Sequence, residues 1–137
     1  MPLNNFSTDL FTISINGRII TDFGESDPPY TDDPIDQQST LRRGQGGKAV
    51  RLDRINPGRT VTLNLNPGSP DSAYMQGLMT SKAGIVLSKT QIGTLEGSLG
   101  TEGIIINDGQ VGRGGQTITD DQYIMEFNGW IQSKGGE

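Results

Sequence analysis

The stretch Thr60–Asn66, with the sequence TVTLNLN, alternates polar and apolar side chains without a break. A two-residue period is typical of a half-buried β-strand, with every second side chain directed toward the core. The side chains predicted to face the core are Val61, Leu63 and Leu65. Pro67-Gly68 follows at once, and it ends the strand because proline lacks the backbone N–H of a sheet ladder and glycine turns freely.

The residues after this turn predict a short α-helix over about 70–82. Ser69 is a favoured N-cap, Pro70 suits the first helical position, and Asp71 lies at the positive end of the helix dipole. Four apolar side chains follow at helical spacing and form one stripe: Tyr74, Met75, Leu78 and Met79. Lys82 and Gly84 mark the last turn and the end of the only helix that the sequence predicts.

The rest of the chain reads as strands and turns. Leu10–Ile15 alternates, Asn16-Gly17 is the favoured type I′ turn, and Arg18–Phe23 returns as the second strand of a hairpin. Further strands are predicted at 35–43, 49–55, 85–87, 104–106 and 123–132. Ile104–Ile106 is apolar at every position and is therefore expected to be buried on both faces. The glycine-rich stretch Ser88–Gly103 gives no clear assignment.

Composition limits the classes of function. The 137 residues suit one domain with a modest core, which neighbouring copies could help to complete. Cysteine and histidine are both absent, so disulfides, cysteine–zinc sites and histidine-based catalysis are excluded. No apolar run reaches the length of a membrane span and no signal peptide is evident, so a soluble cytosolic product is expected. The net charge of −5 argues against attraction of the whole chain to nucleic acid.

Acidic and basic residues gather in adjacent stretches. Gly24–Asp36 is acidic and rich in proline, and it is expected to be a surface loop. The six acids between 22 and 36 are Asp22, Glu25, Asp27, Asp32, Asp33 and Asp36. The six basic residues between 42 and 59 are Arg42, Arg43, Lys48, Arg51, Arg54 and Arg59. The two stretches either pair within one chain or join copies head to tail, the kind of contact that forms rings or filaments.

The residues with catalytic or ligand-binding potential give no enzyme signature. The adjacent acids Asp32/Asp33 and Asp120/Asp121 are expected to be solvated loop charges, because neighbours on a strand point to opposite faces. The glycine-lysine pair at 47–48 fails as a phosphate loop, since Ala49 replaces the required hydroxyl residue. The spacing of the acids matches no calcium loop. We therefore predict no catalytic residue, no metal site and no cofactor.

The order of these features resembles the tail tube proteins of contractile-tailed bacteriophages. The resemblance runs from about Phe11 to Gln132. It rests on the ISING hairpin at 13–17, the acidic segment, the basic glycine-rich hairpin, TVTLNL at 60–65, the Ser69-Pro70 helix start and the final Trp130-Ile131 strand. It implies a mainly β fold, an antiparallel β-sandwich or half-open barrel flanked by one short α-helix. Secretion-system tube proteins share this fold.

The resemblance also implies a role and partners. Hexameric rings would stack into a tube that conducts DNA in a virion tail assembled in the host cytoplasm. The partners would be the tail sheath, tape-measure, baseplate and terminator proteins, with no membrane. One domain spans 1–137, with an arm at 1–9 and a basic hairpin tip at 40–50. A secretion-system tube protein and a monomeric β-sandwich binding module stay open as alternatives.

Two sets of residues follow as candidates for assembly. Contacts between rings or subunits are expected at Arg42, Arg43, Lys48, Arg51, Asp32, Asp33 and Asp36. The wall of the tube is expected to be lined by the polar faces of strands, at Thr12 and Ser14 or at Thr60, Thr62 and Asn64.

Overall fold

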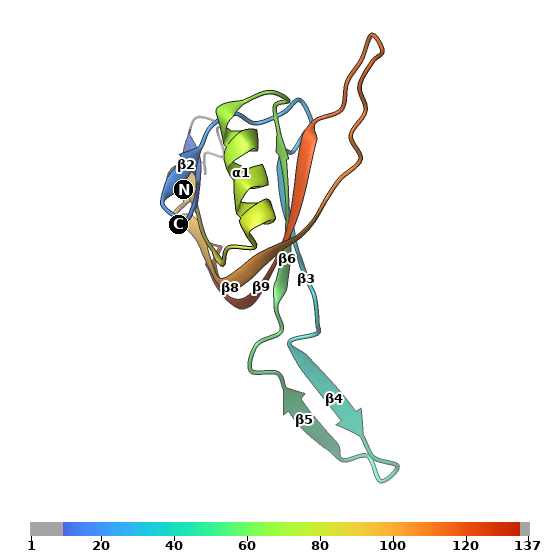
Figure 1. Cartoon of the computed structure of the whole chain (residues 1–137). Coiled ribbons are helices and arrows are strands. Elements are labelled where there is room, and N and C mark those ends of the chain that lie inside the picture. The colour runs from blue at the N-terminus through green and yellow to red at the C-terminus, as the bar shows by residue number, and fades with distance from the viewer. Residues whose placement is uncertain (1–9, 135–137) are drawn as a thin grey trace.

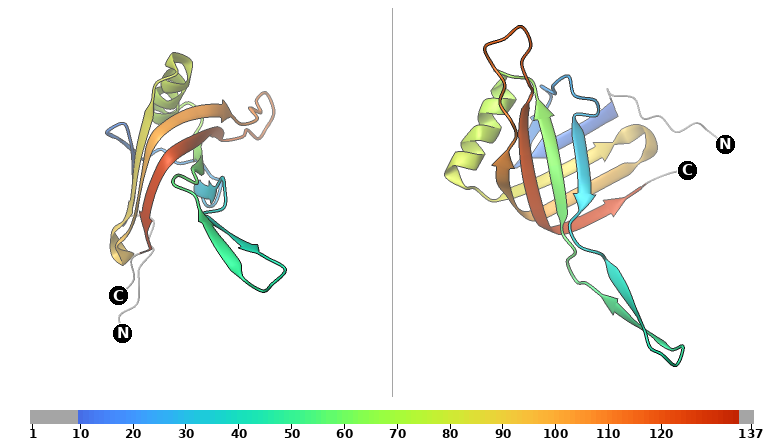
Figure 2. Two further views of the ribbon diagram at one scale, coloured as in Figure 1. Left: turned by 90° about the horizontal axis from the view of Figure 1, so that it is seen from below. Right: turned by 90° about the vertical axis from the view of Figure 1, so that its right-hand side faces the viewer.

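The computed structural model describes residues 10–134, so the predicted arm at 1–9 lies outside the described residues. Seven antiparallel strands form one curled sheet in the order β2-β1-β7-β8-β9-β6-β3, and β2 and β3 are its two edges (Figures 1 and 2). The strands are β1 (Phe11–Ile15), β2 (Arg18–Ile20), β3 (Tyr30–Pro34), β6 (Arg59–Leu65), β7 (Ile85–Gln91), β8 (Glu96–Asp108) and β9 (Asp121–Ser133). The sheet does not close into a barrel, which confirms the half-open, mainly β fold that was predicted.

The strand β6, next to the edge strand β3, has the predicted alternation. Val61, Leu63 and Leu65 are fully buried, while the residues between them are partly exposed on the other side of the sheet. β6 pairs with β9 on one side and with β3 on the other. The strands β1, β6, β7 and β9 each contribute two or more residues to one core, which is completed by Ile20 of β2 and Met75 of the helix.

The helix α1 (Pro70–Ser81) covers the core face of the sheet, as Figure 1 shows. The Ser69 hydroxyl accepts a hydrogen bond from the backbone N–H of Ser72, which confirms the predicted cap. The helix ends at Lys82, whose left-handed backbone (φ 56°) takes the place usually held by glycine. α1 is the only α-helix among residues 10–134, and a short 3-10 turn occupies Ile92–Thr94.

Asp71 fixes the start of the helix to β2. Its carboxylate is buried and accepts hydrogen bonds from Arg18 Nε (2.9 Å), Thr21 N (2.8 Å) and Asp22 N (3.0 Å). Burial alone would raise the pKa of Asp71, but these hydrogen bonds and the Arg18 charge outweigh it and hold the pKa below its usual value.

We therefore expect Asp71→Asn to lower the free energy of unfolding by about 2 kcal/mol at pH 7, since an amide accepts at one atom only and carries no charge. Because the pKa of Asp71 is lowered on folding, its charge adds stability above the unfolded pKa of about 3.9, and that stability disappears as the pH falls. Urea unfolding at pH 7 and pH 3 measures the difference. The exposed Asp27→Asn is the control, with an expected change under about 0.5 kcal/mol. An Asp71→Asn effect that is the same at both pH values would contradict this role.

The stretch that the sequence left unassigned, Ser88–Gly103, forms most of β7, the 3-10 turn and the first half of β8. β8 is bulged at Glu102, which has φ 53°, and it then passes close to the core. A Cβ atom at Gly103 would lie 2.3 Å from Cδ1 of Phe127. Glycine at this position therefore leaves room for the Phe127 ring to pack against β8.

Two predictions about strands are wrong. Ile104–Ile106 does form part of β8, but Ile104 and Ile106 are 54% and 45% exposed, because this end of the strand has only one face against the core. The acidic segment 24–36 is not loop throughout, since Tyr30–Pro34 pairs with β6 as strand β3. The aspartates of this segment made it resemble a loop in the sequence, but it forms a strand whose inward-facing residues are Tyr30 and Asp32.

The predicted basic hairpin is present and stands apart from the sheet. β4 (Ser39–Arg43) and β5 (Ala49–Asp53) pair only with each other among the described strands. The loop at 109–120, between β8 and β9, projects from the opposite end of the molecule (Figure 1). The molecule thus carries two projections that point away from each other.

Candidate functional site

The β4–β5 hairpin presents its side chains to solvent. Every residue of both strands is exposed. Within residues 10–134, no ion pair joins the tip residues Arg42, Arg43 or Lys48 to an acid, and Arg51 pairs with Asp53 of the same hairpin. The predicted basic tip is therefore free of the acidic segment of its own chain.

The acidic segment divides between the interior and the surface. Asp32 lies inside the curled sheet and accepts a hydrogen bond from Arg59 Nε at 2.9 Å, so pairing within the chain is limited to this one contact between the two predicted stretches. Asp33 and Asp36 are exposed. The prediction that Asp32 and Asp33 are both solvated loop charges is therefore wrong for Asp32, because the strand directs the two side chains to opposite faces.

Asp32 belongs to a buried polar network that spans the open side of the sheet. The Tyr30 hydroxyl donates to Asp32 Oδ2 (2.8 Å), and Lys89 Nζ lies 3.0 Å from Glu96 Oε1 and 4.0 Å from Asp32 Oδ2. Burial opposes the charge of Asp32, but the bonds from Arg59 and Tyr30 and the nearby cations hold its pKa below the usual value. Burial, with the Asp32 charge, raises the pKa of Tyr30, which therefore stays protonated and donates. The network joins β3 and β6 to β7 and β8, strands from the two halves of the sheet.

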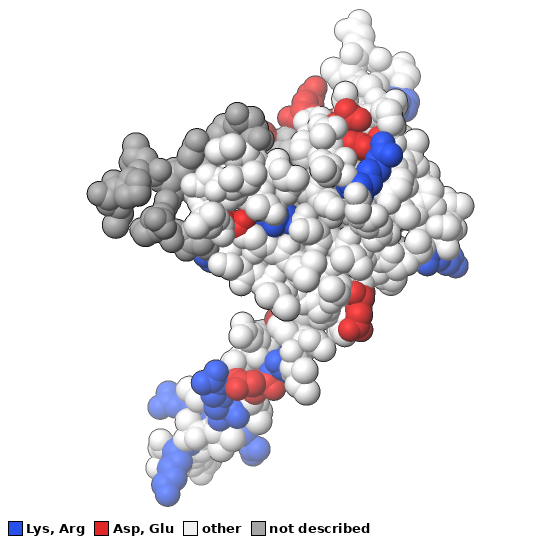
Figure 3. Space-filling model, turned by 90° about the vertical axis from the view of Figure 1, so that its left-hand side faces the viewer, with Lys and Arg blue, Asp and Glu red and all other residues white. Residues whose placement is uncertain are grey.

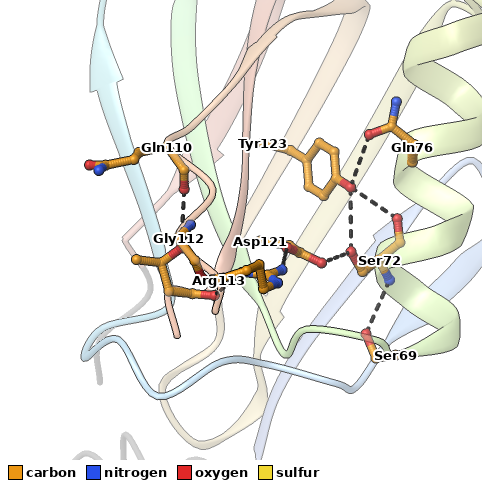
Figure 4. A network of polar contacts seen from close by, with 9 residues as sticks. Ser69, Ser72, Gln76, Gln110, Gly112, Arg113, Asp121 and Tyr123 are labelled. Carbon is orange, nitrogen blue, oxygen red and sulfur yellow. Dashed lines mark hydrogen bonds and ion pairs between the residues drawn. The ribbon is translucent and has the colours of Figure 1, made fainter. Parts of the chain in front are cut away.

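A second network fixes the base of the loop at 109–120, and Figure 4 shows it. Asp121 accepts hydrogen bonds from the Ser72 hydroxyl and from Arg113 Nη2, the latter at 2.7 Å. The Tyr123 hydroxyl donates to the Ser72 backbone carbonyl at 3.1 Å. Burial raises the pKa of Tyr123 and thereby keeps this hydroxyl protonated. Helix, strand and loop are thus joined around one carboxylate.

The neighbouring acid Asp120 holds the loop at 24–26. Its carboxylate accepts hydrogen bonds from Glu25 N (3.2 Å) and from Ser26 N and Oγ (2.8 and 2.7 Å). Burial opposes the charge on Asp120, and these bonds outweigh it, so its pKa is lowered. The prediction of solvated loop charges at Asp120 and Asp121 is wrong, because each carboxylate bonds to a separate structural element.

The candidate lumen residues share one face of the sheet. Thr12, Ser14, Thr60, Thr62 and Asn64 alternate with buried residues and therefore point away from the core. The register pairs Thr60 with the acidic residues Asp33 and Glu126, which therefore lie on the same outer face. Threonine and serine dominate the same face on β1 and β7, where Thr12 pairs with Thr90 and Ser14 with Ser88. The outer face thus combines polar and acidic positions with exposed apolar ones, since Ile19 pairs with Ser14 and Ile104 with Glu126.

Within the described residues, no group of three His, Cys, Asp or Glu side chains is arranged to hold a metal ion. The carboxylates of the two adjacent acid pairs do not face each other across an open site. In the part of the chain that is described, no helix is long and apolar enough to cross a membrane.

Comparison with solved structures finds several chains with a similar fold. The chain matches a chain from the anti-feeding prophage cap, described as the AFP tube-terminating cap, with a TM-score of 0.58 and 14% identity over 98% of this chain and 95% of that one. It matches a chain of the sheath–tube complex of the PVC extracellular contractile injection system in its extended state, with a TM-score of 0.59 and 10% identity over 95% and 92%. The sheath/tube terminator of that system gives a TM-score of 0.56 and 14% identity over 97% of each chain.

The chain has the fold of subunits of contractile injection systems. No protein-family model matches the sequence. No curated protein matches it either. The likeness is therefore carried by the arrangement of the strands and the helix over nearly the whole chain, at an identity of 10–14%.

Sequence reasoning missed the buried network of Lys89, Glu96, Asp32 and Arg59. Its members come from four strands, and no local pattern links residue 32 to residue 89. The alternation of β7 does carry one signal. Lys89 and Gln91 continue the inward positions of Ile85 and Leu87, which predicts polar groups inside the sheet.

Proposed function

We propose that this chain is a structural subunit of the inner tube of a contractile tail, forming hexameric rings that stack into a conduit. The observation that carries the proposal is the match over more than 90% of both chains to subunits of sheath–tube and terminator complexes. The whole chain would act as one tube domain. Residues 1–9 would reach a neighbouring subunit, and the tip at 40–50 would reach the next ring.

The sheet supports this role physically. Its two edge strands, β2 and β3, leave backbone groups unpaired, and neighbouring copies in a ring would cover them. The outer face, with Thr12, Ser14, Thr60, Thr62 and Asn64, would line the tube. Asp33 and Glu126 on this face are acidic, so they would repel phosphate and oppose adhesion of DNA. In a virion, genomic DNA and a tape-measure protein would pass through, with sheath, baseplate and terminator proteins as partners. Assembly would take place in the host cytoplasm.

Imaging of the purified full-length chain tests the proposal. Negative-stain microscopy over a range of concentrations is expected to show rings of about six subunits, or tubes made of such rings. Light scattering is expected to give the molecular mass of these assemblies. Lone monomers at every concentration would overturn the proposal and would favour a monomeric β-sandwich binding module.

A second candidate is a terminating ring. Two of the matched chains come from a cap and a terminator complex, with TM-scores close to that of the sheath–tube complex. A terminator closes a tube, so it would form single rings that do not stack at any concentration. A secretion-system tube would instead stack like a tail tube, and its genetic setting distinguishes the two.

The basic tip provides a direct variant. Arg42→Glu with Arg43→Glu is expected to leave the fold intact, because both residues are exposed and lie outside the sheet, and to abolish stacking of rings at moderate salt. Tube length by microscopy and circular dichroism measure the two effects. Arg42→Lys with Arg43→Lys keeps the charge and is expected to stack nearly as the parent does. Tubes of normal length from the glutamate variant would remove the tip from the stacking contact.

A further inference from the structure

The two faces of the β4–β5 hairpin differ in their chemistry. In the register of the hairpin, Thr40 lies opposite Leu52 and Arg42 opposite Val50, so these four side chains share one face, which we call the VL face. The other face carries Ser39, Leu41, Arg43, Ala49, Arg51 and Asp53. Each of the two arginines at the tip of β4 thus belongs to a different face.

The face opposite the VL face satisfies its own polar groups. Asp53 Oδ1 accepts a hydrogen bond from Ser39 Oγ at 2.6 Å and another from Arg51 Nε at 2.8 Å. Its one large apolar residue, Leu41, is flanked by Arg43 and Arg51 and does not adjoin a second one. This face is therefore stable when exposed to solvent.

The VL face, by contrast, exposes apolar side chains and an arginine without an ion pair among the described residues. Val50 and Leu52 are 58% and 53% exposed and lie next to each other on one strand face, with Arg42 beside them and no ion pair to Arg42 among the described residues. A two-stranded hairpin by itself is marginally stable in water. An extended hairpin with an apolar pair and a free cation on one face fits a surface that is both apolar and acidic.

The opposite end of the same molecule has the complementary charge. Glu25, Asp27 and Asp108 lie there, in the loop after β2 and at the end of β8, and no ion pair engages them within residues 10–134. Figure 3 shows several acidic side chains at that end, with basic ones beside them, and mainly basic side chains along the hairpin. The exposed Val111 and Ile118, in the loop that projects from the acidic end, supply apolar surface. By contrast, Asp33 and Asp36 adjoin the base of the hairpin of their own chain, where Asp36 N bonds to Pro57 O.

We propose that the VL face of the hairpin docks on the acidic end of a second copy of this chain, with Arg42 facing Glu25, Asp27 and Asp108. The inference rests on the proposed function and names the partner surface for the stacking contact. Nucleic acid is a poorer fit to the hairpin, because no aromatic side chain lies between 39 and 53 to stack on bases. Head-to-tail docking of unlike ends repeats without closing, which is what a stack of rings requires.

Adjacent arginines test which face docks. Arg42→Glu and Arg43→Glu change the same charge on neighbouring residues of opposite faces. At low salt, Arg42→Glu is expected to raise the concentration needed for stacking by tenfold or more, and Arg43→Glu by less than about threefold. Val50→Ser with Leu52→Ser is expected to act like Arg42→Glu, with Leu41→Ser as its control. Equal effects of the two arginine variants, or a larger effect of Arg43→Glu, would overturn the assignment of the face.

A charge swap tests the partner surface. Glu25→Lys with Asp27→Lys is expected to impair stacking, and adding these two changes to Arg42→Glu is expected to restore stacking to within about threefold of the parent. A triple variant that stacks no better than Arg42→Glu alone would overturn the acidic end as partner.

The tests separate this inference from the proposed function. A parent chain that forms neither rings nor tubes contradicts both. A parent that stacks while the two hairpin faces behave alike, or while the swap fails, contradicts the inference and leaves the tube role standing. Circular dichroism melting of each variant, expected to match the parent, shows that the sheet is unchanged.

Discussion

Leu63→Asp is expected to leave the chain unfolded. Leu63 is fully buried at the centre of β6, where the register places it between Tyr30 of β3 and Tyr123 of β9. An aspartate there would lose the packing of a leucine and bring a carboxylate into a cluster of buried apolar side chains. Loss of the side chain costs about 2–5 kcal/mol and the unpaired charge costs several more. Domains of this size have about 5–15 kcal/mol in total.

The adjacent residue supplies the control for this variant. Thr62 points to the outer face of the same strand and is partly exposed, so Thr62→Asp places the same charge in the same strand without entering the core. We expect Thr62→Asp to fold, with a loss under about 1 kcal/mol. Circular dichroism and soluble yield compare the two variants. A soluble Leu63→Asp protein with the parent spectrum would contradict the position of β6 in the core.

The strand β6 and the helix α1 are predictable because their signals are local. The alternation of 60–66, the Pro67-Gly68 stop and the Ser69 cap all act within a few residues, and each element ends where the signal lies. The Asn16-Gly17 turn behaves in the same way, with φ values of 51° and 87° at the two residues. Where sequence and geometry act on the same few residues, reasoning from residues gives the structure.

The strand β3 and the ends of β8 depend on partners that are distant in sequence. Tyr30–Pro34 carries two aspartates and a proline, and only its pairing with β6 makes it a strand. Ile104–Ile106 is apolar, but Ile104 and Ile106 are exposed on the outer face of the described structure, so the prediction of burial on both faces is wrong. In an assembled ring or stack such exposed apolar residues are where a further subunit could pack.

The candidate assembly surfaces were only partly accessible from sequence. The basic hairpin follows from its turn and its charges, and it is exposed as predicted. The division of the hairpin into two faces follows only from the register of Arg42 opposite Val50, which the length of the turn fixes. The location of Asp32 inside the sheet required the pairing of β3 with β6, and it explains why this carboxylate bonds to Arg59 of its own chain.

Removing the partner of Asp32 is expected to have the second large effect on folding. Arg59 donates to Asp32, and its guanidinium lies 5.9 Å from the centre of the Trp130 ring. Arg59→Met would keep much of the packing on Trp130 and leave a buried carboxylate with Tyr30 and the more distant Lys89. Breaking a buried ion pair by removal of one partner costs about 3–5 kcal/mol, and we expect about 3 kcal/mol at pH 7 because those two contacts remain.

The effect of Arg59→Met on the free energy of unfolding is expected to depend on pH. Folding lowers the pKa of Asp32 in the parent, so the Asp32 charge stabilises the parent above the unfolded pKa of about 3.9, and this stability is lost as the pH falls through the folded pKa. In Arg59→Met, burial is opposed by fewer contacts, so protonation of Asp32 at low pH relieves the unpaired charge. The difference in unfolding free energy between parent and variant is therefore expected to shrink between pH 7 and pH 3 in urea titrations.

The matched control for Arg59→Met is the double variant with Asp32→Asn. Without the carboxylate, the methionine faces a neutral amide, so the double variant is expected to be more stable than Arg59→Met alone at pH 7. The same comparison at pH 3 is expected to show little difference, because Asp32 is then largely neutral in the single variant as well. If Arg59→Met loses the same free energy at both pH values, and Asp32→Asn recovers none of it, then the ion pair does not hold β3 against β6, and packing on Trp130 alone accounts for the role of Arg59.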